Sequence, residues 1–134
     1  RKKSDPTCFE LTSNEKGKYS NSTFRVLRQY SNFACVEIEP YTGRTHQIRV
    51  HSSSLANPIF GDNKYGGGIK KSNEYANEFR RISSSVISRF NRHALHAISI
   101  EFELMNSNGK RLKLNSPIPD ELIELEKRLS VNEN

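Results

Sequence analysis

Residues 41–51 read Tyr-Thr-Gly-Arg-Thr-His-Gln-Ile-Arg-Val-His and form the densest polar cluster of the chain, with two arginines, two histidines and a glutamine. Pro40, Thr42 and Gly43 interrupt the strand pattern, whereas Ile48 and Leu55 recur at helical spacing. The stretch therefore predicts a corner where a strand gives way to a helix over residues 45–56. At such a corner the first helical amides can face an anion, and arginine can donate paired hydrogen bonds to a phosphate or a carboxylate.

Two pairs of strands are predicted from alternating apolar and polar residues. The first pair covers residues 23–30 and 33–39, which are separated by a short Ser-Asn connection. The second pair covers residues 94–104 and 111–114, with a turn at residues 106–109. Both pairs are close enough in sequence to form antiparallel hairpins.

Two amphipathic helices are predicted in the second half of the chain. Over residues 78–92 the apolar side chains step by three and four positions and describe one narrow helical stripe, made of Phe79, Ile82, Val86 and Phe90. Asp120 can cap a last helix, whose apolar residues are Leu122, Ile123, Leu125 and Leu129. Residues 61–68 are rich in glycine and predict a loop with positive backbone angles. The order of these elements predicts an α+β fold built on antiparallel strands.

The composition is that of one small, basic domain. The chain has 134 residues, 34% of them hydrophobic, and its 21 lysines and arginines against 15 acidic residues give a net charge of +6. This balance favours a polyanionic partner, although a basic domain with no nucleic-acid role would have the same charge. Cys8 and Cys35 lack metal-ligand spacing, and no secretory signal or apolar run of transmembrane length is present. These features predict buried thiols in an intracellular protein without a membrane segment.

Three sequence blocks, in this order, resemble one known family. They are Thr42-Gly43-Arg44-Thr45-His46-Gln47-Ile48-Arg49-Val50-His51, then Pro58-Ile59-Phe60-Gly61-Asp62 with Tyr65-Gly66-Gly67, and then Arg92-His93-Ala94-Leu95-His96-Ala97. Together with the ending Ser116-Pro117-Ile118-Pro119, they are similar to the C-terminal signature of RluA-type RNA pseudouridine synthases. The resemblance covers about residues 20–129. It implies that residues 1–134 are part of a catalytic domain with an antiparallel or mixed β-sheet and flanking helices.

The resemblance also implies a reaction. Enzymes of this family detach the base of a uridine in RNA, rotate it and rejoin it through carbon, with no metal or organic cofactor. Their essential aspartate lies in an upstream Arg-Leu-Asp block that this sequence does not contain, since its only aspartates are Asp5, Asp62 and Asp120. Asp62 matches the Gly-Asp loop of the family and is assigned to loop structure or to shaping the site. We therefore expect the chain alone to lack activity.

Five residues of the first block are candidates for the site. By the resemblance, Arg49 matches the basic residue that pairs with the catalytic aspartate, and Ile48 matches an apolar residue of the active site. A carboxylate in an enclosed pocket needs such a charge to stay ionised. The alternative for Arg49 is a salt bridge to a surface glutamate. Arg44, His46 and Gln47 are candidates for contact with RNA, because a base must leave its stack to react. For His46 a structural hydrogen bond that fixes the corner is equally open.

The resemblance favours ribosomal RNA as the substrate, with transfer RNA second, and a monomeric cytoplasmic enzyme. A zinc site is not expected, because the pairs His46 with His51 and His93 with His96 have spacings that point their side chains apart. The arginines of the helix at residues 78–92 either contact RNA or solvate an ordinary outer face. Two rival functions stay open, a non-catalytic RNA-binding protein derived from a synthase and a structural domain whose charge is incidental. Binding to RNA that weakens steeply with salt would exclude the second.

Overall fold

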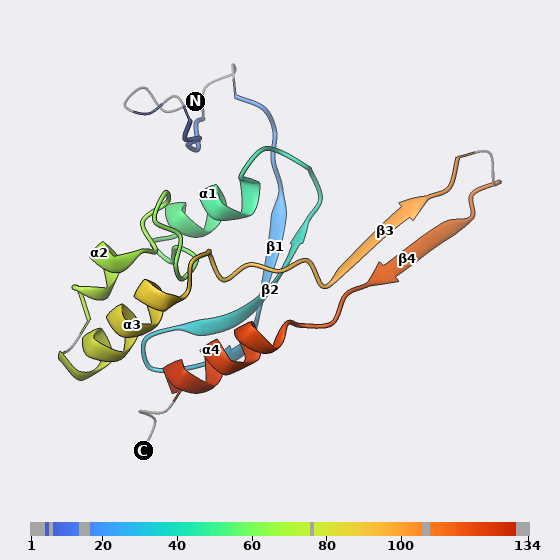
Figure 1. Cartoon of the computed structure of the whole chain (residues 1–134). Helices are drawn as coiled ribbons and strands as arrows, with labels where there is room; N and C mark the ends of the chain where they lie inside the picture. Colours follow the sequence, from blue (N-terminus) through green and yellow to red (C-terminus); the bar gives the residue numbers. More distant parts are fainter. Residues whose placement is uncertain (1–4, 6, 14–16, 76, 106–107, 131–134) are drawn as a thin grey trace.

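The predicted α+β class is confirmed by a computed structural model, which describes residues 5, 7–13, 17–75, 77–105 and 108–130 (Figure 1). Its elements in chain order are β1 (Ser22–Gln29), β2 (Ala34–Pro40), α1 (Gln47–Ser54), α2 (Ile69–Ser72), α3 (Asn77–Arg89), β3 (Ser99–Glu103), β4 (Arg111–Asn115) and α4 (Asp120–Ser130). Every predicted strand and helix has a counterpart in the structure. The short α2 was not predicted.

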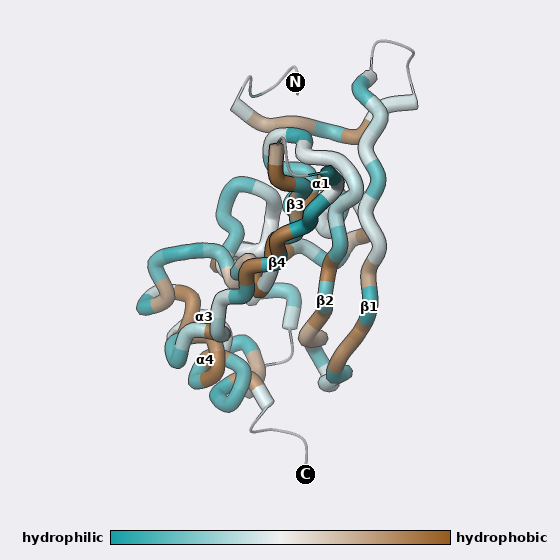
Figure 2. Tube along the Cα trace, turned by 90° about the vertical axis from the view of Figure 1, so that its right-hand side faces the viewer, coloured by the Kyte–Doolittle hydropathy of each residue, from teal (hydrophilic) through white to brown (hydrophobic). Residues whose placement is uncertain are grey.

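The first hairpin pairs β1 with β2 in antiparallel register, as predicted. Phe24 lies opposite Ile38 and Val26 opposite Val36, and a bulge follows between Val26 and Arg28. Phe24 and Ile38 are half-buried, whereas Val26 is 56% exposed, so the apolar side chains of this hairpin are only partly covered. Figure 2 shows apolar and polar stretches alternating along this hairpin.

The second hairpin is shorter than predicted and stands away from the rest of the chain (Figure 1). β3 begins at Ser99 rather than at residue 94, because the backbone N–H of Ala94 donates to the carbonyl of Phe60 and ties this segment to the glycine loop. The antiparallel register of β3 with β4 places Ile100 opposite Leu114. Among the described residues β3 pairs with β4 and β1 with β2, so the antiparallel strands form two two-stranded sheets. Two residues of the predicted turn, 106–107, lie outside the described residues.

The main hydrophobic core joins α3 to α4. Its buried members are Phe79, Val86, Leu125 and Leu129, and Ile82, Phe90 and Leu122 pack against them. The apolar stripe predicted for α3 is therefore confirmed. The helix ends at Arg89 instead of residue 92, because the chain beyond it turns to pack against Gly61.

The glycine loop adopts the backbone angles that its sequence predicts. Gly61 has φ +78° and Gly66 has φ +93°. A Cβ at Gly67 would come within 1.9 Å of the carbonyl oxygen of Ile59, so the loop closes over itself at a point where only hydrogen fits. Backbone hydrogen bonds in both directions, Gly61 N–H to Gly67 O and Gly67 N–H to Asp62 O, are each 2.8 Å long.

A smaller cluster holds the start of the described chain against α1 and the loop. Cys8, Val50 and Tyr65 are buried together, with Phe9 packed on them. The thiol of Cys8 is buried, as predicted, whereas that of Cys35 is only half-buried. Within the described residues, every helix is too short or too polar to cross a membrane.

Replacing Leu125 with alanine should lower the free energy of unfolding by about 2–5 kcal/mol, because it removes a side chain that is 6% exposed in the core between α3 and α4. The matched control is Ile123→Ala on the same helix, where the side chain is 41% exposed. That change should stay within about 0.5 kcal/mol. Urea denaturation of the two variants measures the difference, and equal losses would contradict the assigned core.

Replacing Gly67 with alanine should destabilise the loop, because its new methyl group would overlap the Ile59 carbonyl. Gly43→Ala is the control, since a Cβ there meets no atom within 4 Å. We expect Gly67→Ala to cost at least about 1–3 kcal/mol in urea denaturation, the range of an overpacked site, with Gly43→Ala costing much less. A Gly67→Ala variant as stable as the parent would show that the loop opens freely.

Candidate functional site

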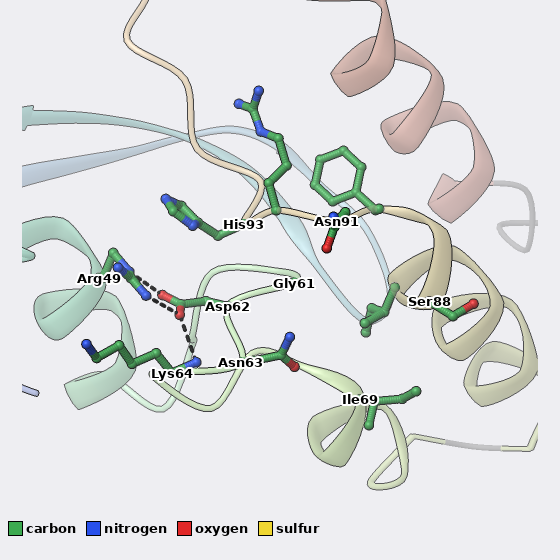
Figure 3. A pocket seen from close by; sticks show the side chains of 12 residues that line it. Arg49, Gly61, Asp62, Asn63, Lys64, Ile69, Ser88, Asn91 and His93 are labelled. Carbon is green, nitrogen blue, oxygen red and sulfur yellow. Dashed lines mark hydrogen bonds and ion pairs between the residues drawn. The ribbon is translucent and has the colours of Figure 1, made fainter. Parts of the chain in front are cut away.

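A cavity of about 490 Å³ lies between α1, the glycine loop and the end of α3 (Figure 3). Its walls include Arg49, Asp62, Asn63, Asn91 and His93, and Ile69, Ile87 and Phe90 supply apolar surface. The volume falls within the range of pockets that bind small ligands. The mixture of apolar surface and a few polar groups suits a ligand that is partly flat and partly hydrogen-bonding.

The strongest interaction at this cavity joins Arg49 to Asp62. The Nε of Arg49 donates to Oδ2 of Asp62 at 2.8 Å, and its Nη2 donates to Oδ1 at 2.7 Å. The Asp62 side chain is 1% exposed and that of Arg49 is 15% exposed. Arg49 therefore pairs with Asp62 and not with a surface glutamate, which was the alternative. Figure 3 shows the two side chains pointing toward each other at the edge of the cavity.

Each member of this pair favours the charged form of the other. Burial alone would raise the pKa of the Asp62 carboxyl, but the hydrogen bonds and positive charge of Arg49 outweigh it and lower that pKa. The Asp62 carboxylate in turn raises the pKa of Arg49, against the opposing effect of burial. Both groups are ionised at neutral pH.

The loop backbone fixes the Asp62 carboxylate independently of Arg49. The backbone N–H groups of Lys64 and Tyr65 both lie 3.2 Å from Oδ1 and donate to it. This arrangement needs the loop to double back within a few residues, which the positive φ of Gly61 allows. The sequence analysis assigned Asp62 to loop structure or site shaping, and its contacts include both backbone and site residues.

Tyr65 connects the pair to the corner before α1. Its ring centroid lies 4.8 Å from the guanidinium carbon of Arg49, a cation–π contact. Its hydroxyl oxygen accepts a hydrogen bond from the N–H of Phe9 at 3.0 Å and lies 2.8 Å from Nδ1 of His46. We assign the tyrosine O–H as the donor to Nδ1, which makes His46 a neutral imidazole with its proton on Nε2. The pKa of His46 is lowered, first by burial and then by the charge of Arg49.

The other predicted RNA contacts lie just outside the cavity. Gln47 is 6% exposed, and its amide oxygen accepts from Thr42 and from the Arg44 N–H, while its amide nitrogen donates to Asn21 and Ser22. This side chain holds the corner together. Arg44 is exposed and donates through Nε to the carbonyl of Tyr19. Ile48 is half-buried on α1 beside Arg49.

The remaining basic groups are spread around the cavity. Lys64, Arg92 and His93 line it, and Arg81 and Arg89 are exposed on α3. Across the described residues there is no group of three histidine, cysteine, aspartate or glutamate side chains that could hold a metal ion. His51 instead bonds with the hydroxyl of Ser20 at 3.0 Å.

The pairing of Arg49 with Asp62 was not predicted from the sequence. The expected partner was a carboxylate from elsewhere in the protein, and Asp62, thirteen positions along the chain, was assigned to loop structure or to shaping the site. The available signal was that a helical arginine near a buried loop needs a carboxylate, and Asp62 is the one acidic residue among residues 58–68. Tyr65 belongs to the second sequence block, but the spacing of residues in the sequence does not predict its contacts with Arg49, Phe9 and His46.

Known proteins are similar to this chain in sequence. A family model described as RNA pseudouridylate synthase matches residues 3–54. The Ribosomal large subunit pseudouridine synthase D of Vibrio cholerae is 34% identical over 81% of this chain, and that of Haemophilus influenzae is 33% identical over the same share. An Uncharacterized RNA pseudouridine synthase of Chlorobaculum parvum is 30% identical over 80% of the chain.

In each of these comparisons the chain spans 32% of the relative's own length. The matched part includes the corner with Arg49 and the glycine loop with Asp62. On this similarity the chain belongs to the RluA-type family of RNA pseudouridine synthases.

Proposed function

We propose that this chain forms part of an enzyme that isomerises uridine to pseudouridine in RNA, and that Arg49 is its helper to the catalytic carboxylate. The observation that carries the proposal is the position of Arg49. Its guanidinium is nearly buried, is held by Asp62 and lies at the wall of a cavity of about 490 Å³. Membership of the synthase family supplies the reaction.

The chemical role of Arg49 follows from the charge that the reaction needs. In the family an aspartate outside the blocks found here attacks the uridine and must be ionised to do so. An enclosed site disfavours that ionised form, and a fixed guanidinium restores it, because arginine keeps its charge at any working pH. Ile48, next to Arg49 on α1, is proposed to line the apolar side of the same site.

The RNA contacts are proposed for three residues at the corner before α1. Arg44 is exposed in the turn between β2 and α1 and suits a phosphate, and His46 lies one turn from Arg49. Gln47 is retained as a proposed contact, although its buried amide favours a role in supporting Arg44. A net charge of +6 supports binding to a polyanion. A uridine that leaves its stack would need a cavity of the kind that Arg49 borders.

Ribosomal RNA is the proposed substrate class, with transfer RNA second, because the relatives from Vibrio cholerae and Haemophilus influenzae are named as large-subunit ribosomal enzymes. We propose that the full-length enzyme is a cytoplasmic monomer that uses no metal or organic cofactor. The alternative of a non-catalytic RNA-binding protein is not favoured, since these relatives carry the names of synthases.

Replacing Arg49 with lysine in the full-length protein should lower kcat/KM by at least about 100-fold, because an ammonium cannot donate in parallel to Asp62 and face a second carboxylate. Activity is measured as the release of tritium from 5-tritiated uridine in a ribosomal RNA transcript, since C5 loses its hydrogen when it bonds to the sugar. Arg25→Lys, in the exposed pair with Glu37, is the control and should leave the rate unchanged. An Arg49→Lys enzyme with near-parental activity would refute the role given to Arg49.

The chain of 134 residues alone should release no tritium in the same assay, because the proposed carboxylate lies outside it. The full-length protein, tested in parallel on the same transcript, should convert uridine. Turnover by the 134-residue chain would overturn the assignment of Asp62 and Arg49 to supporting roles.

A further inference from the structure

The contacts of Asp62 give it a part in the reaction, and this step depends on the function proposed above. We propose that Asp62 is a positioning residue, which grips one edge of the Arg49 guanidinium so that the opposite edge faces the catalytic carboxylate. Asp62 would not touch the uridine. It would set the direction in which Arg49 donates.

The first argument is the rigidity of the carboxylate. Asp62 is 1% exposed, and two backbone N–H groups, those of Lys64 and Tyr65, donate to its Oδ1. The loop that carries these groups is closed by paired bonds between Gly61 and Gly67 and between Gly67 and Asp62. A carboxylate fixed by the main chain in this way can orient a longer and more flexible side chain.

The second argument is the geometry of the guanidinium. Arginine has five N–H donors in one plane, and Arg49 uses one on Nε and one on Nη2 for Asp62. The two hydrogens of Nη1 and the second hydrogen of Nη2 lie outside this pair and point away from it. The guanidinium carbon lies over the ring of Tyr65, 4.8 Å from its centroid, and this contact further restricts the rotation of the guanidinium. A second carboxylate can therefore approach in the plane, from the side of Nη1.

The third argument is the location of the pair. Both Arg49 and Asp62 line the cavity (Figure 3). The pair of Arg25 with Glu37 has side chains that are 69% and 34% exposed, and that of Arg28 with Glu126 has values of 51% and 26%. Such exposed pairs contribute little to stability and can form or break with little effect. Arg49 and Asp62 combine deep burial with access to a ligand-sized space.

A purely neutralising role for Asp62 predicts the opposite change in the ionisation of the catalytic carboxylate. If Asp62 only neutralised Arg49, its negative charge would oppose ionisation of the catalytic carboxylate, and removing that charge would make ionisation easier. If Asp62 positions Arg49, removing its charge lets the guanidinium swing away and makes ionisation harder. The acidic limb of the kcat/KM profile reports this ionisation in the free enzyme. When the charge of Asp62 is removed, the acidic limb moves to lower pH if Asp62 only neutralises Arg49 and to higher pH if Asp62 positions Arg49.

The test uses Asp62→Asn in the full-length enzyme, with tritium release from a ribosomal RNA transcript measured across pH. We expect kcat to fall by about 10- to 100-fold with KM for RNA little changed, and the acidic limb to move to higher pH. Glu37→Gln, which breaks the exposed pair with Arg25, should leave both the rate and the profile unchanged. An acidic limb that stays in place or moves to lower pH in Asp62→Asn would overturn the proposal.

A measurement without any change at Asp62 covers the case in which that variant does not fold. The measurement is the NMR signal of the Arg49 Nε–H in the full-length enzyme. When the upstream catalytic aspartate is replaced by asparagine, this signal should keep its chemical shift and its slow hydrogen exchange with water, because Asp62 holds the group. Loss of that signal would mean that Arg49 depends on the upstream residue, and would overturn the proposal. Failure of the unmodified full-length enzyme to release tritium would instead refute the proposed function itself.

Discussion

The structure around the cavity depends on one buried ion pair. Withdrawing a carboxylate and a guanidinium from water is costly, and the cost is offset only when their donors and acceptors are satisfied. Asp62 accepts two hydrogen bonds from Arg49 and two from the loop backbone. The tight closure at Gly67 supports this arrangement, because it presents the amides of the loop to the carboxylate. Removing one partner would leave an unpaired charge inside the chain.

A second layer of contacts extends from this pair to the start of the described chain. Tyr65 lies against Arg49, bonds with His46 and accepts from the backbone of Phe9. His46 adopts a left-handed conformation with φ 55°, and α1 begins at the next residue. The neutral form of His46 is suited to this position, since a protonated ring could not accept from Tyr65 and would add charge beside Arg49. The corner is thus held by neutral hydrogen bonds around a charged centre.

Local pattern predicted much of the fold. The stripe from Phe79 to Phe90 and the glycine loop were predicted correctly, because helical periodicity and glycine's backbone freedom are properties of neighbouring residues. The late start of β3, at Ser99 instead of residue 94, was not predicted, since it depends on a hydrogen bond between Ala94 and Phe60 that joins distant segments. The pairing of Arg49 with Asp62 was missed for the same reason. The family resemblance marked both residues, but only the folded loop brings them within 2.8 Å.

The β3–β4 hairpin has a consequence for handling the chain. Its register puts Ile100, Phe102, Leu112 and Leu114 on one face, and these side chains are between 37% and 59% exposed. The opposite face carries charged, hydrated side chains, namely Glu101, Glu103, Arg111 and Lys113. The described residues add no further strand to either edge of this ribbon. A two-stranded ribbon with one apolar side is a template for strand-to-strand pairing between molecules. Solubility of the 134-residue chain at high concentration therefore depends on shielding this ribbon.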